Sequence, residues 1–234
     1  ALAERLDVRL HTHLGETRDE NAYCEQRLGM RPVDYLETCG WLTPRTWLAH
    51  GIHFSDDEIS RLGTAGVAVS HCPHSNMILA SGLCPACVLE NAGSPLGLGV
   101  DGSASNDASN AIEEVRCALM LQRLREGAAA IGHRDALRWA TAGGARCLGR
   151  DDIGRIVTGA QADLALFRLD ELRHSGYHDP LAALVLCGVT RADRVMVAGR
   201  WLVEDGRASH IDEAELVRRH GAAARRLRQR AGLE

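Results

Sequence analysis

Short apolar segments alternate with helical patterns over about the first 150 residues, and this alternation most constrains the fold. Residues 8–13, 46–50, 67–70 and 96–101 have the composition and length of strands. Parallel strands need a long crossover connection, usually a helix, whereas a tight hairpin can join only antiparallel neighbours. The sequence therefore predicts an α/β fold built on a parallel sheet.

The expected helices lie between and after these strands. They cover residues 19–28, 32–38, 55–62, 85–91, 110–126 and 134–148. The start at residue 55 is the best defined, because Ser55 followed by Glu58 is a capping-box pattern in which each side chain satisfies a free backbone N–H group.

From Gly154 onward the pattern becomes that of short strands and turns. We expect a turn over 159–163, strands over 164–169 and 183–187, a hairpin formed by 195–198 and 201–203 around Gly199 and Arg200, and an arginine-rich amphipathic helix over 212–231. This change predicts a separate small β domain followed by a terminal helix.

Composition limits the classes of partner. The chain has 234 residues and a net charge of −4, which argues against nucleic acid or a membrane surface as the main partner. It has no apolar stretch of the ~18 residues that a membrane span requires, and its start does not resemble a signal peptide. We therefore expect a cytoplasmic protein.

Eight cysteines are many for such a chain. Only Cys84 and Cys87, in the segment Cys-Pro-Ala-Cys, have the spacing of metal ligands. A structural zinc would need a second pair, and a thioredoxin-type motif would open a helix after a strand in a small redox domain. The simplest interpretation is two packed thiols, and the role of the pair stays open.

Candidate metal ligands lie at the ends of three predicted strands. In strands, side chains alternate between faces, so His11 and His13 share a face, and Asp101 shares one with the glycines at 97 and 99. Asp101 and His50 close their segments. A lone histidine here is often a hydrogen-bonded loop residue, and a lone aspartate a turn former. Together, imidazoles and a carboxylate on rigid strands predict a hydrolytic metal site.

Four motifs in order resemble those of the amidohydrolase superfamily, within it the mononuclear aminohydrolases that deaminate purines, pterins and related rings. The motifs are His11-Thr-His-Leu-Gly-Glu16, Leu48-Ala-His-Gly51, Ser70-His-Cys-Pro-His-Ser-Asn-Met77 and Val100-Asp-Gly-Ser-Ala-Ser-Asn-Asp107. The segments 31–36 and 146–154 are most similar to deaminases of 8-oxoguanine, with hydroxyatrazine-type hydrolases next.

The resemblance implies an α/β fold of the (β/α)8 TIM-barrel type. Residues 1–152 would form the second half of the barrel, strands five to eight. Residues 153–210 would form part of a small β-sandwich domain, and 211–234 the C-terminal amphipathic helix. Four strands cannot close an eight-stranded barrel, so we expect the N-terminal half to come from a longer polypeptide or a complementing chain. By itself the segment is expected to be inactive.

The resemblance also implies roles for individual residues. His13 and Asp101 would bind one divalent metal, Zn²⁺ first and Fe²⁺ as an alternative. Asp101 would also accept a proton from the attacking water, Glu16 would protonate the ring nitrogen, and His50 would orient the hydroxide. The weaker candidates for substrate contact are His11, His74 and Asn76.

The implied reaction is hydrolytic deamination of a purine-like, 8-oxoguanine-type ring, with release of ammonia. A metal is needed because water is a poor nucleophile toward an aromatic amidine carbon. Triazines of the hydroxyatrazine type, and adenosine or guanine, are alternative substrates. An alternative of another class is a non-catalytic scaffold or incomplete fragment. Besides the heterocyclic substrate and the other half-barrel, we expect self-association into a homo-oligomer.

Overall fold

The computed structural model describes residues 2–189 and 191–233. The chain divides into two compact units, described separately below. Unit 1 consists of residues 1–160 and 169–190, and unit 2 of residues 161–168 and 191–234.

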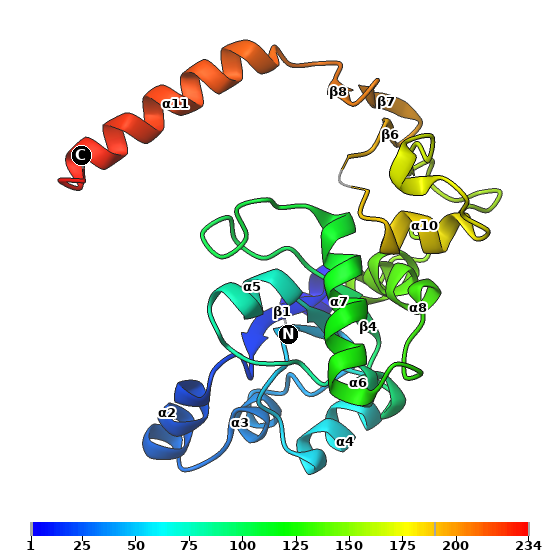
Figure 1. Cartoon of the computed structure of the whole chain (residues 1–234). Coiled ribbons are helices and arrows are strands. Elements are labelled where there is room, and N and C mark those ends of the chain that lie inside the picture. The colour runs from blue at the N-terminus through cyan, green and yellow to red at the C-terminus, as the bar shows by residue number, and fades with distance from the viewer. Residues whose placement is uncertain (1, 190, 234) are drawn as a thin grey trace. The chain divides into compact units, whose positions relative to one another are not determined.

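Unit 1 is built on a parallel sheet of four strands in sequence order (Figure 1). The strands are β1 (Leu10–Leu14), β2 (Thr46–His50), β3 (Ala68–His71) and β4 (Leu96–Leu98). Each pairs in parallel with the next. The predicted α/β fold with a parallel sheet is therefore confirmed. The last strand is shorter than expected, since it ends at Leu98 and leaves Asp101 in the loop that follows.

Helices connect and follow these strands (Figure 1). They are α1 (Leu2–Leu6), α2 (Arg18–Leu28), α3 (Pro32–Thr38), α4 (Asp56–Thr64), α5 (Pro73–Ile78), α6 (Ala86–Asn91), α7 (Ala111–Glu126), α8 (His133–Arg138), the π-helix η1 (Trp139–Gly143), α9 (Gly144–Leu148), the 3-10 helix η2 (Leu172–His174) and α10 (Pro180–Leu186). The capping box at Ser55 is confirmed. Its hydroxyl accepts from the backbone N–H of Glu58, and the Glu58 carboxylate accepts from the backbone N–H of Ser55.

The single helix expected over 134–148 is divided by the π-helix η1. This segment packs directly against β4. A Cβ atom on Gly143 would lie 2.0 Å from the carbonyl oxygen of Leu96, so only glycine permits this approach of helix backbone to strand backbone. The contact is tertiary, and helical periodicity does not reveal it.

The two faces of the parallel sheet differ in burial. Leu48, Val69 and Leu96 point to the helix-covered face and are fully buried in the core. The opposite face, here called the open face, carries His11, His13, Trp47, Ala49, Ser70 and Gly97, and it lines a hollow of about 350 Å³. The strand alternation expected from the sequence thus separates a closed apolar face from an open one that bears imidazoles.

One predicted strand is wrong. Residues 183–187 were expected to be extended, but Pro180–Leu186 form α10. Asp179 caps the helix by accepting from the backbone N–H groups of Leu181 and Ala182, and Pro180 occupies a position where its missing N–H costs nothing. Short apolar runs do not distinguish a buried helix from a strand, and here the cap decides.

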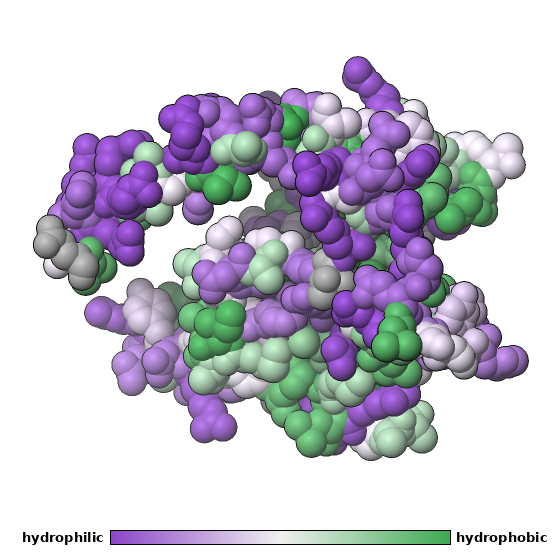
Figure 2. Space-filling model, turned by 45° about the horizontal axis from the view of Figure 1, so that its top comes forward, coloured by the Kyte–Doolittle hydropathy of each residue, from purple (hydrophilic) through white to green (hydrophobic). Residues whose placement is uncertain are grey.

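Unit 2 contains an antiparallel sheet of β5 (Leu164–Leu166), β6 (Arg194–Val197), β7 (Arg200–Glu204) and β8 (Arg207–Ala208), followed by α11 (Glu213–Arg230). The predicted hairpin is confirmed, with Ala198 and Gly199 both at positive φ in the turn. The surface of α11 is mainly hydrophilic (Figure 2), with Leu216, Val217 and Leu227 exposed.

The domain segments expected at 1–152, 153–210 and 211–234 stay a prediction. Residues 169–190 belong to unit 1, where α10 contacts α7 and α8. Among the described residues, no helix is long and apolar enough to cross a membrane.

His71, at the end of β3, gives a prediction about stability. Its ring is 1% exposed and neither nitrogen has a hydrogen-bond partner in the described structure. Burial, aided by the neighbouring His50, lowers the pKa of His71 from 6.5 to about 3. As the pH falls, the unfolded chain therefore takes up a proton on this ring before the folded chain does. The contribution of the neutral ring to the free energy of unfolding is complete above pH 6.5 and is lost as the pH falls toward 3. We expect a loss of about 3 kcal/mol between pH 7 and 4.5.

Urea unfolding at the two pH values measures this loss, with His71→Leu as the comparison. The variant should lose less stability than the wild type over the same interval, because the remaining carboxylates titrate in both proteins. Equal losses in the two proteins would show that His71 is not held neutral by burial.

Candidate functional site

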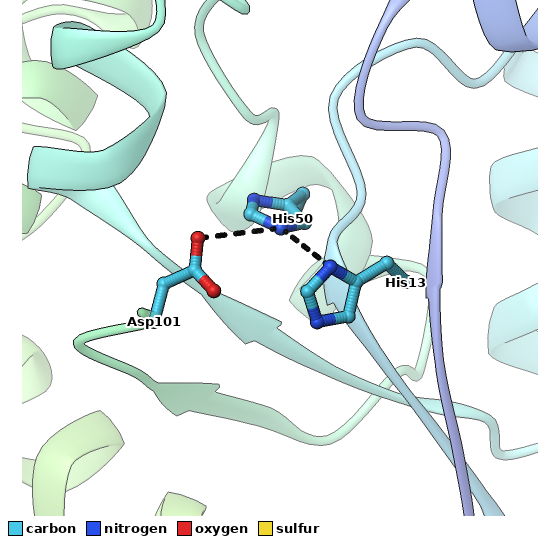
Figure 3. A group of neighbouring side chains, drawn as sticks. All are labelled: His13, His50 and Asp101. Atoms are coloured by element: carbon cyan, nitrogen blue, oxygen red, sulfur yellow. Dashed lines mark hydrogen bonds and ion pairs between the residues drawn. The ribbon is translucent and has the colours of Figure 1, made fainter. Parts of the chain in front are cut away.

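Three of the predicted site residues converge at the carboxyl ends of the parallel strands (Figure 3). His13 lies in β1, His50 ends β2, and Asp101 lies in the loop after β4. His50 Nε2 is 3.2 Å from His13 Nδ1 and 3.8 Å from Asp101 Oδ2. The potential ligand atoms of all three lie within 4.8 Å of one another. Residues 88 positions apart in sequence thus form one polar cluster.

Backbone conformation helps to form this cluster. Simple alternation along β2 would place His50 with Leu48, on the face that packs into the core. His50 instead has φ 71°, and Asp101 has φ 60°, a left-handed conformation that is uncommon outside glycine. Such strained residues are characteristic of functional sites. At both positions the left-handed residue ends the extended backbone, and its side chain lies in the cluster with His13.

Asp101 is held as a carboxylate by hydroxyl groups. Ser75 Oγ donates to Asp101 Oδ2 at 2.5 Å, and Ser105 Oγ lies 3.2 Å from the same oxygen. Burial opposes ionisation, but hydrogen bonds from Ser75 and from the backbone N–H of Gly102, with the nearby His50, lower the pKa of Asp101 below its usual value. A deprotonated carboxylate is the form that binds a cation or accepts a proton.

His50 is fully buried and fixed by Asn76. Its Nδ1 is 2.9 Å from Asn76 Oδ1. Because an amide oxygen is only an acceptor, Nδ1–H donates this bond. The other nitrogen, Nε2, then faces His13, Asp101 and the predicted proton carrier Glu16, whose Oε2 is 3.6 Å away. All four principal candidates from the sequence are therefore neighbours.

The three weaker candidates have other partners. His11 stacks on the indole of Trp47, with ring centroids 3.5 Å apart, and lies on the open face. Burial lowers the pKa of His11, which the hydrogen bond to the Trp47 carbonyl partly opposes. Asn76 bonds His50, and His74 bonds Glu114. Their contact with a substrate stays a prediction.

Four residues of the network were not predicted from sequence: Ser75, Ser105, Asn106 and Glu114. The first three lie inside the motifs that contain Asn76 and Asp101, and this proximity was the available signal. Nothing in the sequence distinguishes Glu114 from an ordinary first-turn helix carboxylate, since its burial depends on a fold contact with His74, 40 residues away in the chain.

The donor set fits a divalent cation. Imidazole nitrogens and a carboxylate oxygen suit zinc or iron, and those of His13, His50 and Asp101 are near enough to share one ion. Cys72 lies beside them on the open face. Burial, together with the carboxylates of Asp101 and Glu114, raises the pKa of its thiol to about 12, although a hydrogen bond from the backbone of His50 acts in the other direction. This thiol stays protonated and is a poor ligand.

Cys84 and Cys87 have a packing role. Gln122 of α7 donates to the carbonyl of Cys84 and accepts from the N–H of Cys87, which ties the turn to the helix. Cys84 is fully buried. Within the described residues, neither thiol belongs to a group of three potential metal ligands, and the role of the pair beyond this packing stays open.

Comparison with known proteins extends this picture. Residues 1–202 match the amidohydrolase family model. The chain is 65% identical over 226 residues to 8-oxoguanine deaminase of Pseudomonas aeruginosa, a match that covers 97% of this chain and 50% of the relative. It is 37% identical to isoxanthopterin deaminase from an unknown prokaryotic organism, over 97% of this chain and 50% of the relative.

Two solved structures share the fold. An adenosine deaminase from Xanthomonas campestris with bound zinc has a TM-score of 0.91 at 37% identity, covering 98% of this chain and 52% of that one. An atrazine chlorohydrolase from Arthrobacter aurescens, complexed with zinc, has a TM-score of 0.90 at 37% identity, covering 94% and 49%. This chain thus spans about half the length of the relatives it matches.

The predicted resemblance is confirmed by the match over most of the chain and by the similarity to 8-oxoguanine deaminase. The chain belongs to the amidohydrolase family.

Proposed function

We propose that this chain supplies the catalytic carboxylates and part of the metal site of a deaminase acting on a purine-like ring of the 8-oxoguanine type. The observation that carries the proposal is the convergence of His13, Glu16, His50 and Asp101 at one end of the parallel sheet. The 65% identity to 8-oxoguanine deaminase supports this substrate class.

His13 and Asp101 would hold the metal. When bound, a divalent cation such as Zn²⁺ supplies Lewis-acid chemistry that lowers the pKa of water from about 15.7 toward about 7. Zinc in two related structures supports this choice of ion, and Fe²⁺ remains compatible with the same donors.

The side chains of this chain account for the proton movements. Asp101, held deprotonated by Ser75, accepts a proton from the attacking water. Glu16 donates its proton to the ring nitrogen, takes up the proton that Asp101 received from the water, and passes it to the departing ammonia. The hydroxyl proton of the adduct then restores Glu16, and Asp101 is again a carboxylate. His50, oriented by Asn76, presents Nε2 between the two carboxylates and aligns the water. Two carboxyl groups on either side of a reacting carbon suit paired general acid and base catalysis.

We further propose that the four parallel strands are strands five to eight of a (β/α)8 barrel. The open face bears His11 and Trp47 around a hollow, as the interior side of an incomplete barrel would. The relatives that the chain matches are about twice as long. The N-terminal half-barrel, in the same polypeptide or as a complementing chain, would cover this face and supply further ligands, because a catalytic zinc usually has three protein ligands.

A triazine or an adenosine-type ring is the second candidate, because the chain also resembles an atrazine chlorohydrolase and an adenosine deaminase. Self-association into a homo-oligomer is proposed for the complete enzyme. A non-catalytic scaffold is the alternative of another class, but it gives no reason to keep Glu16 beside His50 and Asp101.

Ammonia release by the complete polypeptide tests the proposed function. We expect turnover with 8-oxoguanine to exceed that with guanine, isoguanine, adenosine and hydroxyatrazine. It should be abolished by a chelator and restored by Zn²⁺ or Fe²⁺, and the chain of 234 residues alone should be inactive. Preference for another ring would replace the substrate assignment. Absence of turnover with every ring, or turnover that resists metal removal, would show the proposal to be wrong.

A further inference from the structure

Three consecutive side chains at the start of α5 contact three different parts of the site region. Ser75 Oγ donates to Asp101 at 2.5 Å, and Asn76 Oδ1 accepts from His50 at 2.9 Å. His74, immediately before them, bonds Glu114 of α7. Whatever fixes His74 therefore also fixes the turn that holds both site residues.

Glu114 is only 1% exposed, and its carboxylate accepts three hydrogen bonds. The backbone N–H of His74 donates at 3.1 Å and its ring Nδ1–H at 2.8 Å. Asn106 Nδ2 donates at 2.6 Å. A carboxylate oxygen accepts, so the His74 ring donates in the tautomer that carries its proton on Nδ1, and Asn106 donates through its amide N–H. Glu114 thus joins the loop after β3 to the loop after β4.

The second arm of this network reaches the backbone beside Asp101. Asn106 Nδ2, which bonds Glu114, also donates to the carbonyl oxygen of Val100 at 2.9 Å. The next residue, Asp101, has φ 60°. A non-glycine residue persists in this conformation only where its surroundings impose it. The contact through Asn106 restrains the peptide group that precedes it.

We propose that Glu114 is a positioning residue of the metal and catalytic site. It acts through His74 on the α5 turn that orients Asp101 and His50, and through Asn106 on the backbone at Val100. This inference rests on the proposed function and deepens it. Glu114 does not touch the substrate or the reacting atoms, and its effect is to set the angle and distance at which the site residues meet.

The cost of burying this carboxylate supports the assignment. An apolar side chain at position 114 would pack α7 against the core without desolvating a charge, and such replacements of buried ionic groups are often neutral or stabilising. The neighbouring core positions Val115 and Ala118 follow that apolar pattern. A carboxylate at position 114 is explained by its hydrogen bonds to His74 and Asn106, which lie in two different loops.

The test compares Glu114→Leu and Glu114→Gln with the wild type in the complete polypeptide. Glu113→Gln, on the same turn of α7 and only partly buried, is the matched control. Two readouts are used. The first is the visible absorption spectrum after Co²⁺ is added to protein from which the native metal has been removed, and the second is kcat and KM for the best substrate. Removal of a residue that orients a ligand typically costs about 10- to 100-fold in metal affinity or activity.

We expect Glu114→Leu to lower kcat by about 10- to 100-fold, with a smaller change in KM and an altered Co²⁺ spectrum. Glu114→Gln, which keeps one acceptor oxygen, should fall between Leu and the wild type. His74→Ala and Asn106→Ala each remove one arm and should give partial losses. Adding His74→Ala to Glu114→Leu should then cost less than it does in the wild type, since that arm is already broken.

Several outcomes would overturn the inference. Glu114→Leu with wild-type kcat and an unchanged Co²⁺ spectrum is one. A loss of kcat that merely follows a lower fraction of folded protein is another. If Glu114→Leu fails to fold, wild-type kcat and spectra in both His74→Ala and Asn106→Ala would have the same meaning. A wild-type protein that binds Co²⁺ but releases no ammonia contradicts only the proposed function, whereas one that binds no Co²⁺ contradicts both proposals.

Discussion

Replacing Asp101 with asparagine is expected to lower turnover by the complete enzyme by up to about 10,000-fold. Asparagine has nearly the same shape and keeps an oxygen that can accept from Ser75 and Ser105, which now bond Asp101. What it loses is the charge, and with it both the proton acceptor and the anionic metal ligand. Metal content should therefore fall together with turnover. Steady-state kinetics and atomic absorption on the same preparation measure the two effects.

Asp107→Asn is the control for this substitution. Asp107 is exposed and lies in the same loop, so the change removes an equal charge at a short distance along the chain. We expect turnover and metal content close to those of the wild type. Near-normal activity in Asp101→Asn would exclude Asp101 both as the proton acceptor and as a required ligand.

Replacing Glu16 with glutamine is expected to lower turnover by about 100- to 10,000-fold while leaving metal content unchanged. Glu16 Oε2 is 3.6 Å from His50 Nε2, and glutamine cannot deliver a proton to the ring or to the leaving ammonia. The backbone at this position is held independently, because Glu16 N donates to Glu20 Oε2 at 2.9 Å. The loss should therefore appear in kcat rather than in folding.

Asp19→Asn, an exposed carboxylate in the first turn of α2, provides the comparison. Its turnover should remain near that of the wild type. The two main predictions also differ from each other in a useful way, since Asp101→Asn should lose metal and Glu16→Gln should not. A parallel loss of metal in Glu16→Gln would assign Glu16 to the metal site instead of to proton transfer.

Most elements of unit 1 could be predicted because local patterns and tertiary structure agree there. The helix at Ser55 begins where its capping box predicts, and β2 has the bounds that its apolar pattern indicates. Prediction failed in two places for different reasons. At α10 the apolar run suits a strand equally well, and the local cap formed by Asp179 and Pro180 starts a helix instead. At η1 the close approach of Gly143 to the Leu96 carbonyl is a tertiary contact that helical periodicity does not reveal.

For the site, the sequence predicted which residues take part better than it predicted how their side chains are oriented. His13, His50 and Asp101 were identifiable from residue type and place along the chain, since parallel strands bring their carboxyl ends to one edge. Their mutual orientation was not, because it depends on the left-handed backbone at His50 and Asp101. Neither residue is a glycine, whose presence would have signalled such a conformation.

By itself the sequence determined the α/β pattern, the order of the motifs and which side chains could bind a metal or carry protons. These follow from local propensity, from strand alternation and from the chemistry of imidazole and carboxylate groups. Only the tertiary structure decided which groups meet, that Asn76 orients His50, and that Glu114 joins two loops through His74 and Asn106. The reason is physical: hydrogen bonds between residues far apart in sequence depend on distance and angle, and these exist only after the helices have packed on the sheet.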